Sequence, residues 1–145
     1  MQSFEASTAL DAKRQAEAQI ARAATCPPWR HAVFGLIMGG FVASPAFNLP
    51  VRMALLVLLL AMIPIIIQSD RKRMGMFING YRRGKTRLVT FPMLAIELSL
   101  YAIGVARNMD GREPRTPLLL GGVALIIGLL GSMLWQRVFL REMGA

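Results

Sequence analysis

Glu97 is the residue whose type and position point most directly to chemistry. It is the only charged residue within the four apolar stretches 32–47, 53–67, 88–106 and 117–135. An ionised carboxylate in hydrocarbon costs several kcal/mol, so the side chain is expected to face protein or water. At helical spacing it shares a face with Thr90 and Tyr101. The three residues are a candidate proton or cation site, and the alternative is a protonated glutamate that makes an interhelical hydrogen bond.

Other residues with catalytic or ligating chemistry are scarce. The chain has one cysteine, Cys26, and one histidine, His31. These numbers exclude a disulfide framework within one chain, a Cys-x-x-Cys motif and a cage of several histidines. No nucleophile stands at a recognisable spacing from an activating base. The sequence therefore favours a role without catalysis, and we expect neither a metal ion nor a cofactor.

The apolar stretches predict a membrane protein. Hydrophobic residues make up 54% of the 145 residues and charged residues only 17%. Each stretch approaches the roughly 17–25 residues that a membrane-spanning helix needs. The predicted fold is an all-α bundle of four transmembrane helices, arranged as two helical hairpins over residues 29–145. The predicted spans are about 29–47, 51–69, 88–106 and 117–136.

Residues 1–28 differ from the rest because they are polar and rich in alanine. Small apolar residues recur there at helical spacing, and Pro27-Pro28 must end the helix. We expect an amphipathic cytoplasmic helix in front of the bundle.

The basic residues predict the orientation. The net charge is +9. If both termini are cytoplasmic, 13 of the 17 Lys and Arg residues lie inside and 4 outside, as the positive-inside rule requires. Because these charges flank apolar spans, the expected anionic partner is a lipid headgroup and not nucleic acid. The excess of arginine over lysine suggests a bacterial protein, so we expect the bacterial inner membrane, with both termini inside.

Residues 70–87 form the most basic loop of the chain. Its cations are candidates for docking anionic lipid headgroups or a protein partner, although a loop of this charge could serve only to set the topology. These residues are Arg71, Lys72, Arg73, Arg82, Arg83, Lys85 and Arg87.

Rows of small residues predict where helices pack. Gly35 and Gly39 are one turn apart in the first span, and Gly121, Gly128 and Ser132 follow one face of the fourth. Such rows let helix backbones approach closely in lipid. The contacts could lie within one chain or between copies in a homo-oligomer.

Two functional hypotheses follow. The first is a non-catalytic accessory or interaction subunit that presents the N-terminal helix and the basic loop to a partner. The alternative is a small oligomeric transporter or channel in which Glu97 binds a proton or cation.

Overall fold

The computed structural model describes residues 2–23, 26–74 and 84–142, with side chains for all of these except 2–5, 17, 20–23 and 73–74. The all-α prediction is confirmed for this part of the chain, which forms five α-helices and one 3-10 turn. In chain order the elements are α1 (Gln2–Ala23), α2 (Pro28–Ala43), η1 (Ser44–Ala46), α3 (Leu49–Met74), α4 (Arg87–Arg107) and α5 (Arg115–Glu142).

Three helices are long and apolar enough to cross a membrane: Leu49–Lys72, Arg87–Arg107 and Arg115–Glu142. They contain the predicted spans 51–69, 88–106 and 117–136. α3 continues to Met74, so the first part of the predicted loop 70–87 is helical.

The first predicted span, 29–47, does not form a helix of that length, because α2 ends at Ala43. Pro45 has no amide hydrogen to donate to the carbonyl of Phe41, so the α-helical hydrogen-bond pattern cannot continue there, although Ser44 itself keeps an α-helical backbone conformation. The Ser44 amide bonds to the Phe41 carbonyl instead, and the chain tightens into η1.

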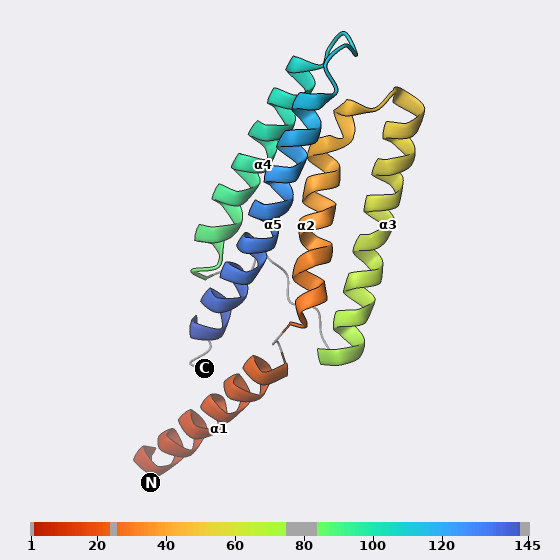
Figure 1. The fold of residues 1–145 in the computed structure, drawn as a ribbon. Helices are drawn as coiled ribbons and strands as arrows, with labels where there is room; N and C mark the ends of the chain where they lie inside the picture. Colours follow the sequence, from red (N-terminus) through yellow and green to blue (C-terminus); the bar gives the residue numbers. More distant parts are fainter. Residues whose placement is uncertain (1, 24–25, 75–83, 143–145) are drawn as a thin grey trace.

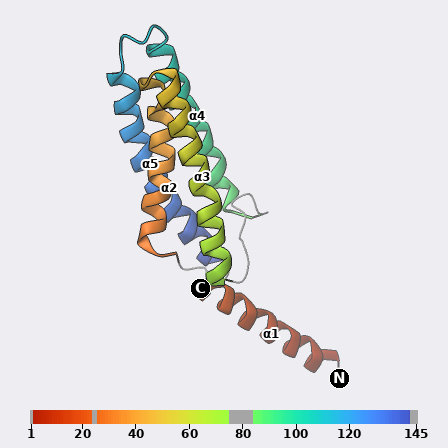
Figure 2. The ribbon, with the colours of Figure 1, turned by 90° about the vertical axis from the view of Figure 1, so that its right-hand side faces the viewer.

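α2 to α5 stand side by side in alternating directions (Figures 1 and 2). α2 contacts α3, α4 and α5, and its most extensive contact is with α5. The start of α2, the end of α3, the start of α4 and the end of α5 share one end of the bundle, where α1 also lies (Figure 1). We call this the α1 end.

The α2–α5 contact is a seam of small residues. A β-carbon added at Gly39 would lie 2.8 Å from the carbonyl oxygen of Gly121, and one added at Gly121 would lie 2.6 Å from Cβ of Ala43. A β-carbon at Gly128 would lie 3.2 Å from Cα of Gly35. The two backbones therefore meet with no room for larger side chains.

Large apolar side chains cover the outside of the bundle. On α3, Leu58, Leu60 and Ile65 are each more than 60% exposed. Such a surface suits lipid, because hydrocarbon does not penalise exposed apolar groups as water does.

α1 extends away from the bundle (Figures 1 and 2). All of its described side chains are exposed, including Leu10. The helix ends at Ala23, before Pro27 and Pro28. The small apolar residues of its described part, Ala9, Ala12 and Ala16, are therefore not covered by the bundle.

Candidate functional site

α4 places Glu97 at its midpoint. Ten residues of the helix precede it and ten follow, so about 15 Å of helix separates it from either end. Glu97 is only 2% exposed. Its carboxyl group is therefore as far from both ends of this candidate span as the helix allows.

The face of α4 that carries Glu97 packs on α5 and α2. One turn before Glu97, Met93 reaches Gly131 of α5, and two turns after it a β-carbon added at Gly104 would lie 3.3 Å from Cβ of Pro117 and 3.6 Å from the Val42 carbonyl oxygen. Glu97 lies between these contacts, at a level where the lining of α5 consists of small and apolar residues.

Neither carboxyl oxygen of Glu97 has a hydrogen-bond partner among the described residues. The interhelical hydrogen bond considered for a structural glutamate is thus not formed within the described part of the chain.

Thr90 and Tyr101, the other candidate site residues, have their own partners. The Thr90 hydroxyl donates to the Thr86 carbonyl oxygen at 3.1 Å within α4. The Tyr101 ring stacks on Phe41 of α2 with centroids 4.5 Å apart, and its hydroxyl accepts a hydrogen bond from the Arg52 guanidinium of α3. That guanidinium also lies over the ring, 5.7 Å from its centroid. The structure therefore places the three residues on one helix without a hydrogen bond between them.

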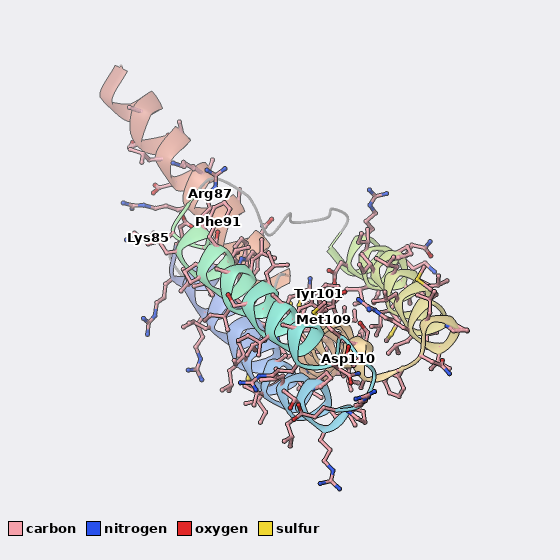
Figure 3. The ribbon with its side chains drawn as sticks, turned by 90° about the horizontal axis from the view of Figure 1, so that it is seen from above. Lys85, Arg87, Phe91, Tyr101, Met109 and Asp110 are labelled. Atoms are coloured by element: carbon pink, nitrogen blue, oxygen red, sulfur yellow. The ribbon has the colours of Figure 1, made fainter. Side chains whose placement is uncertain are left out.

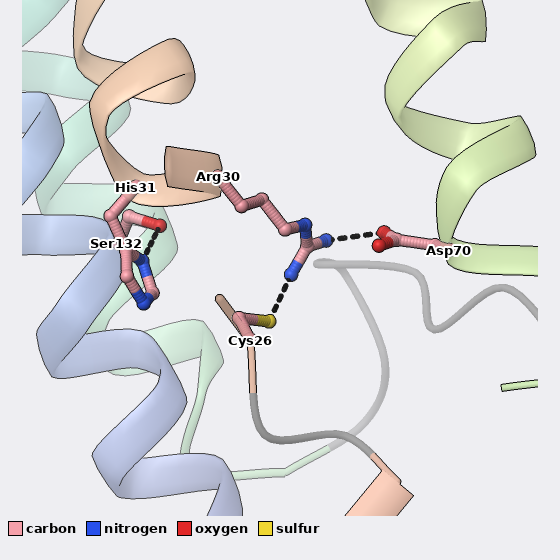
Figure 4. Close-up of polar contacts among 5 residues, drawn as sticks. All are labelled: Cys26, Arg30, His31, Asp70 and Ser132. Atoms are coloured by element: carbon pink, nitrogen blue, oxygen red, sulfur yellow. Dashed lines mark hydrogen bonds and ion pairs between the residues drawn. The ribbon is translucent and has the colours of Figure 1, made fainter. Parts of the chain in front are cut away.

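A second group of polar contacts ties three helices together at the α1 end (Figure 4). Arg30 of α2 forms an ion pair with Asp70 of α3 at 2.6 Å and also contacts Cys26. Beside it, His31 Nδ1 lies 2.8 Å from the hydroxyl oxygen of Ser132 in α5. Sequence reasoning identified Ser132 as a packing residue and missed the ion pair. The ion pair could have been predicted, because Arg30 and Asp70 carry opposite charges and both lie at the predicted cytoplasmic ends of their spans.

Among the predicted docking residues, those whose side chains the structure describes lie at this end and are exposed. They include Arg71 and Lys72 on α3 and Lys85 and Arg87 at the start of α4. Figure 3 shows Lys85 and Arg87 at one end of α4, with Met109 and Asp110 beyond the other. The predicted docking residues Arg82 and Arg83, and the side chain of Arg73, lie outside what the structure describes.

α5 adds two cations that sequence reasoning did not assign to this surface, Arg137 and Arg141, both exposed. The next residue, Glu142, accepts a hydrogen bond of 3.1 Å from the Lys85 amide and so fastens the end of α5 to the start of α4. We call Arg71, Lys72, Lys85, Arg87, Arg137 and Arg141 the basic surface.

Among the described residues, no group of three His, Cys, Asp or Glu side chains could hold a metal ion. The chain matches no protein-family model, no curated protein sequence and no solved structure. Its function must therefore be argued from its own residues.

Proposed function

We propose that the chain is a four-span protein of the bacterial inner membrane with both termini in the cytoplasm. The length of α2 with η1 supports a fourth span, because 16 α-helical and 3 3-10 residues rise about 30 Å, the thickness of the hydrocarbon core. The basic surface supports the orientation, since it lies at the end that the positive-inside rule assigns to the cytoplasm.

Reporter fusions test this topology. Fusions after residue 145 and within residues 68–87 should report a cytoplasmic location, and fusions near Asn48 or Gly111 an external one. An external C-terminus would contradict the four-span arrangement.

The role that the geometry supports best is a non-catalytic accessory or interaction subunit. The observation that carries it is the exposure of α1. Its described side chains are not covered by the bundle, and the helix lies at the same end as the basic surface. A partner in the cytoplasm or at the membrane surface could reach both. Anionic headgroups would add about 1 kcal/mol for each nearby cation and hold this end at the inner leaflet.

A photoreactive residue at Leu10 tests the role of α1 in the intact cell. It should cross-link to a protein partner, whereas the same residue at Leu58 of α3, which is 61% exposed, should cross-link mainly to lipid. Deleting residues 2–23 should remove the partner from protein purified in mild detergent without preventing insertion. Cross-linking at Leu10 to lipid alone, with unchanged co-purification after the deletion, would reject this role.

Glu97 supports a second candidate function, a small oligomeric transporter or channel that couples to protons or cations. The favouring observation is a mid-helix carboxyl group that is buried without a hydrogen-bond partner in the described part of the chain. Intramembrane acids commonly mark ion pathways. Proton flux into proteoliposomes under an imposed pH gradient should occur with the wild type and disappear with Glu97→Gln. Equal signals from both proteins would count against this candidate.

A further inference from the structure

Glu97 combines deep burial with a complete lack of described hydrogen-bond partners, and this combination constrains its charge. The residue is 2% exposed, and both of its oxygens are unpartnered among the residues described. Burial of an ionised carboxylate without a partner costs far more than burial of the neutral acid.

The helices packed against Glu97 bring no cation to it. α4 has no other charged residue between Arg87 and Arg107, and α5 has none between Arg115 and Arg137. On α4 itself, Tyr101 lies one turn from Glu97 and contacts Arg52 of α3. The other titratable or charged groups that face the interior lie at the α1 end, where Arg30 and His31 of α2 contact Asp70 and Ser132.

A bound metal cation fits this site poorly. Hard cations require several oxygen ligands. The Thr90 hydroxyl lies two turns away and already donates to the Thr86 carbonyl. The proton is the one cation that a single carboxyl group can hold alone.

α5 packs on both α2 and α4, and its contact with α4, the helix of Glu97, can loosen more easily than its contact with α2. On the α2 side, the backbones of Gly39 and Gly121 meet directly. On the α4 side, the contact one turn before Glu97 passes through the flexible side chain of Met93 against Gly131, and the contact two turns after it is looser, since a β-carbon added at Gly104 would lie 3.3 Å from Cβ of Pro117. Movement of α4 away from α5 would therefore expose Glu97 while leaving the α2–α5 seam intact.

We propose that Glu97 is a proton-exchange site, which keeps its proton while α4 packs on α5 and exchanges it when α4 separates from α5. This inference rests on the second candidate function, from which it takes Glu97 as the site. It adds that the ion is a proton and that the moving helix is α4. It needs no transported substrate, so its tests fail or succeed separately from the transport test.

Carbodiimide labelling of the purified full chain tests the protonated state. Dicyclohexylcarbodiimide takes the proton of a carboxylic acid on one nitrogen while the carboxyl oxygen adds to its central carbon, and the adduct rearranges to a stable N-acylurea with no atom lost. At about pH 7, Glu97 should carry at least about tenfold more label than the exposed Glu113, because ordinary carboxyl groups are ionised there. Peptide mass spectrometry locates the label. Equal or absent labelling of Glu97 would overturn the proposal.

Disulfide trapping tests the coupling to helix movement. In a Cys26→Ser background, a Met93→Cys/Gly131→Cys pair reports the α4–α5 contact, and a Gly40→Cys/Leu59→Cys pair reports the α2–α3 contact as a control for thiol ionisation. Between about pH 6 and about pH 9, the rate for the first pair relative to the control should fall about twofold or more as Glu97 ionises and the closed state loses population.

Variants of Glu97 show whether its titration causes the pH dependence of the disulfide rate. Glu97→Gln cannot titrate and should make the relative rate independent of pH, whereas Glu97→Asp should keep the dependence. Size-exclusion profiles identify any variant that fails to fold. The same pH dependence in wild type and Glu97→Gln would overturn the coupling between Glu97 and the α4–α5 contact.

Discussion

Asp70 and Glu97 are both almost completely buried, at 3% and 2% exposed, but their surroundings are opposite. Asp70 lies near the end of α3 and pairs with Arg30, whose side chain is 22% exposed. Glu97 lies at the middle of α4, where none of the described residues offers its carboxyl group a hydrogen bond. A charge pair is tolerated near an end of the bundle because one partner still reaches the interface, whereas an ionised carboxyl group at the centre would be buried without a described partner.

The α1 end and the middle of the bundle also differ in the contacts that hold their helices together. At the α1 end, polar contacts connect α2 to α3 and α5. In the middle, α2 and α5 are joined by backbone approach at glycines. The α1 end therefore depends on the identity of its polar partners, and the middle depends on the absence of side-chain volume.

The largest expected effect comes from adding volume to the middle. In Gly121→Leu, Cβ alone would lie 2.6 Å from Ala43 Cβ and 2.8 Å from the Gly39 carbonyl oxygen, so the helices must separate. We expect a loss of about 3 kcal/mol or more in the free energy of unfolding, at the upper end for overpacking. Denaturant unfolding in detergent micelles measures it.

The neighbouring Gly122 provides the matched control, because a β-carbon there meets nothing within 4 Å. Gly122→Leu should leave stability almost unchanged. Equal losses in the two variants would show that helix propensity or insertion, and not the seam, determines the effect.

A smaller loss is expected when the ion pair at the α1 end is broken. Arg30→Met leaves the buried Asp70 without this cation and should cost about 2–3 kcal/mol, below the value for a fully buried pair because Arg30 is partly exposed. Arg30→Met/Asp70→Leu should recover most of the loss, since it removes both charges. A double-mutant cycle measures the coupling, and additive losses would contradict a direct ion pair.

Glu97→Leu should change stability in the other direction. It removes a buried carboxyl group that lacks a described hydrogen-bond partner, so a gain of about 1 kcal/mol is expected. Glu97→Gln should give no such gain, because it retains a buried polar group. A loss of stability in Glu97→Leu, measured by thermal unfolding in detergent, would indicate a hydrogen bond that holds the bundle together.

The sequence predicted the elements whose signals are local. Long apolar stretches predicted α3, α4 and α5, and Pro27-Pro28 marked where α1 ends. The spacing of Thr90, Glu97 and Tyr101 placed them on one face of the helix, and Glu97 is buried in the structure. Periodicity suffices here because it depends only on the geometry of one helix.

The remaining features depend on how helices are rotated against one another. Apolar content predicted a span over 29–47, but α2 ends at Ala43, because Pro45 has no amide hydrogen with which to continue the helix. The Arg52–Tyr101 contact joins residues 49 positions apart and requires α3 and α4 to present particular faces. Hydropathy carries little information on such pairings, because most faces of these helices are apolar.

The smallest expected effect concerns the hydrogen bond between His31 and Ser132 at the α1 end. Ser132→Ala removes the hydroxyl that lies 2.8 Å from His31 Nδ1 and should cost about 0.6 kcal/mol, the average for hydrogen bonds between membrane helices. Ser99→Ala is the matched control, because the Ser99 hydroxyl is exposed and donates to Ala95 of its own helix. Thermal unfolding of both variants in detergent gives the difference. Because alanine also fits the close α2–α5 contact, a loss restricted to Ser132→Ala can be assigned to the hydrogen bond. An equal loss in both variants would instead indicate that this end is held by Arg30 and Asp70, with His31 contributing only its packing.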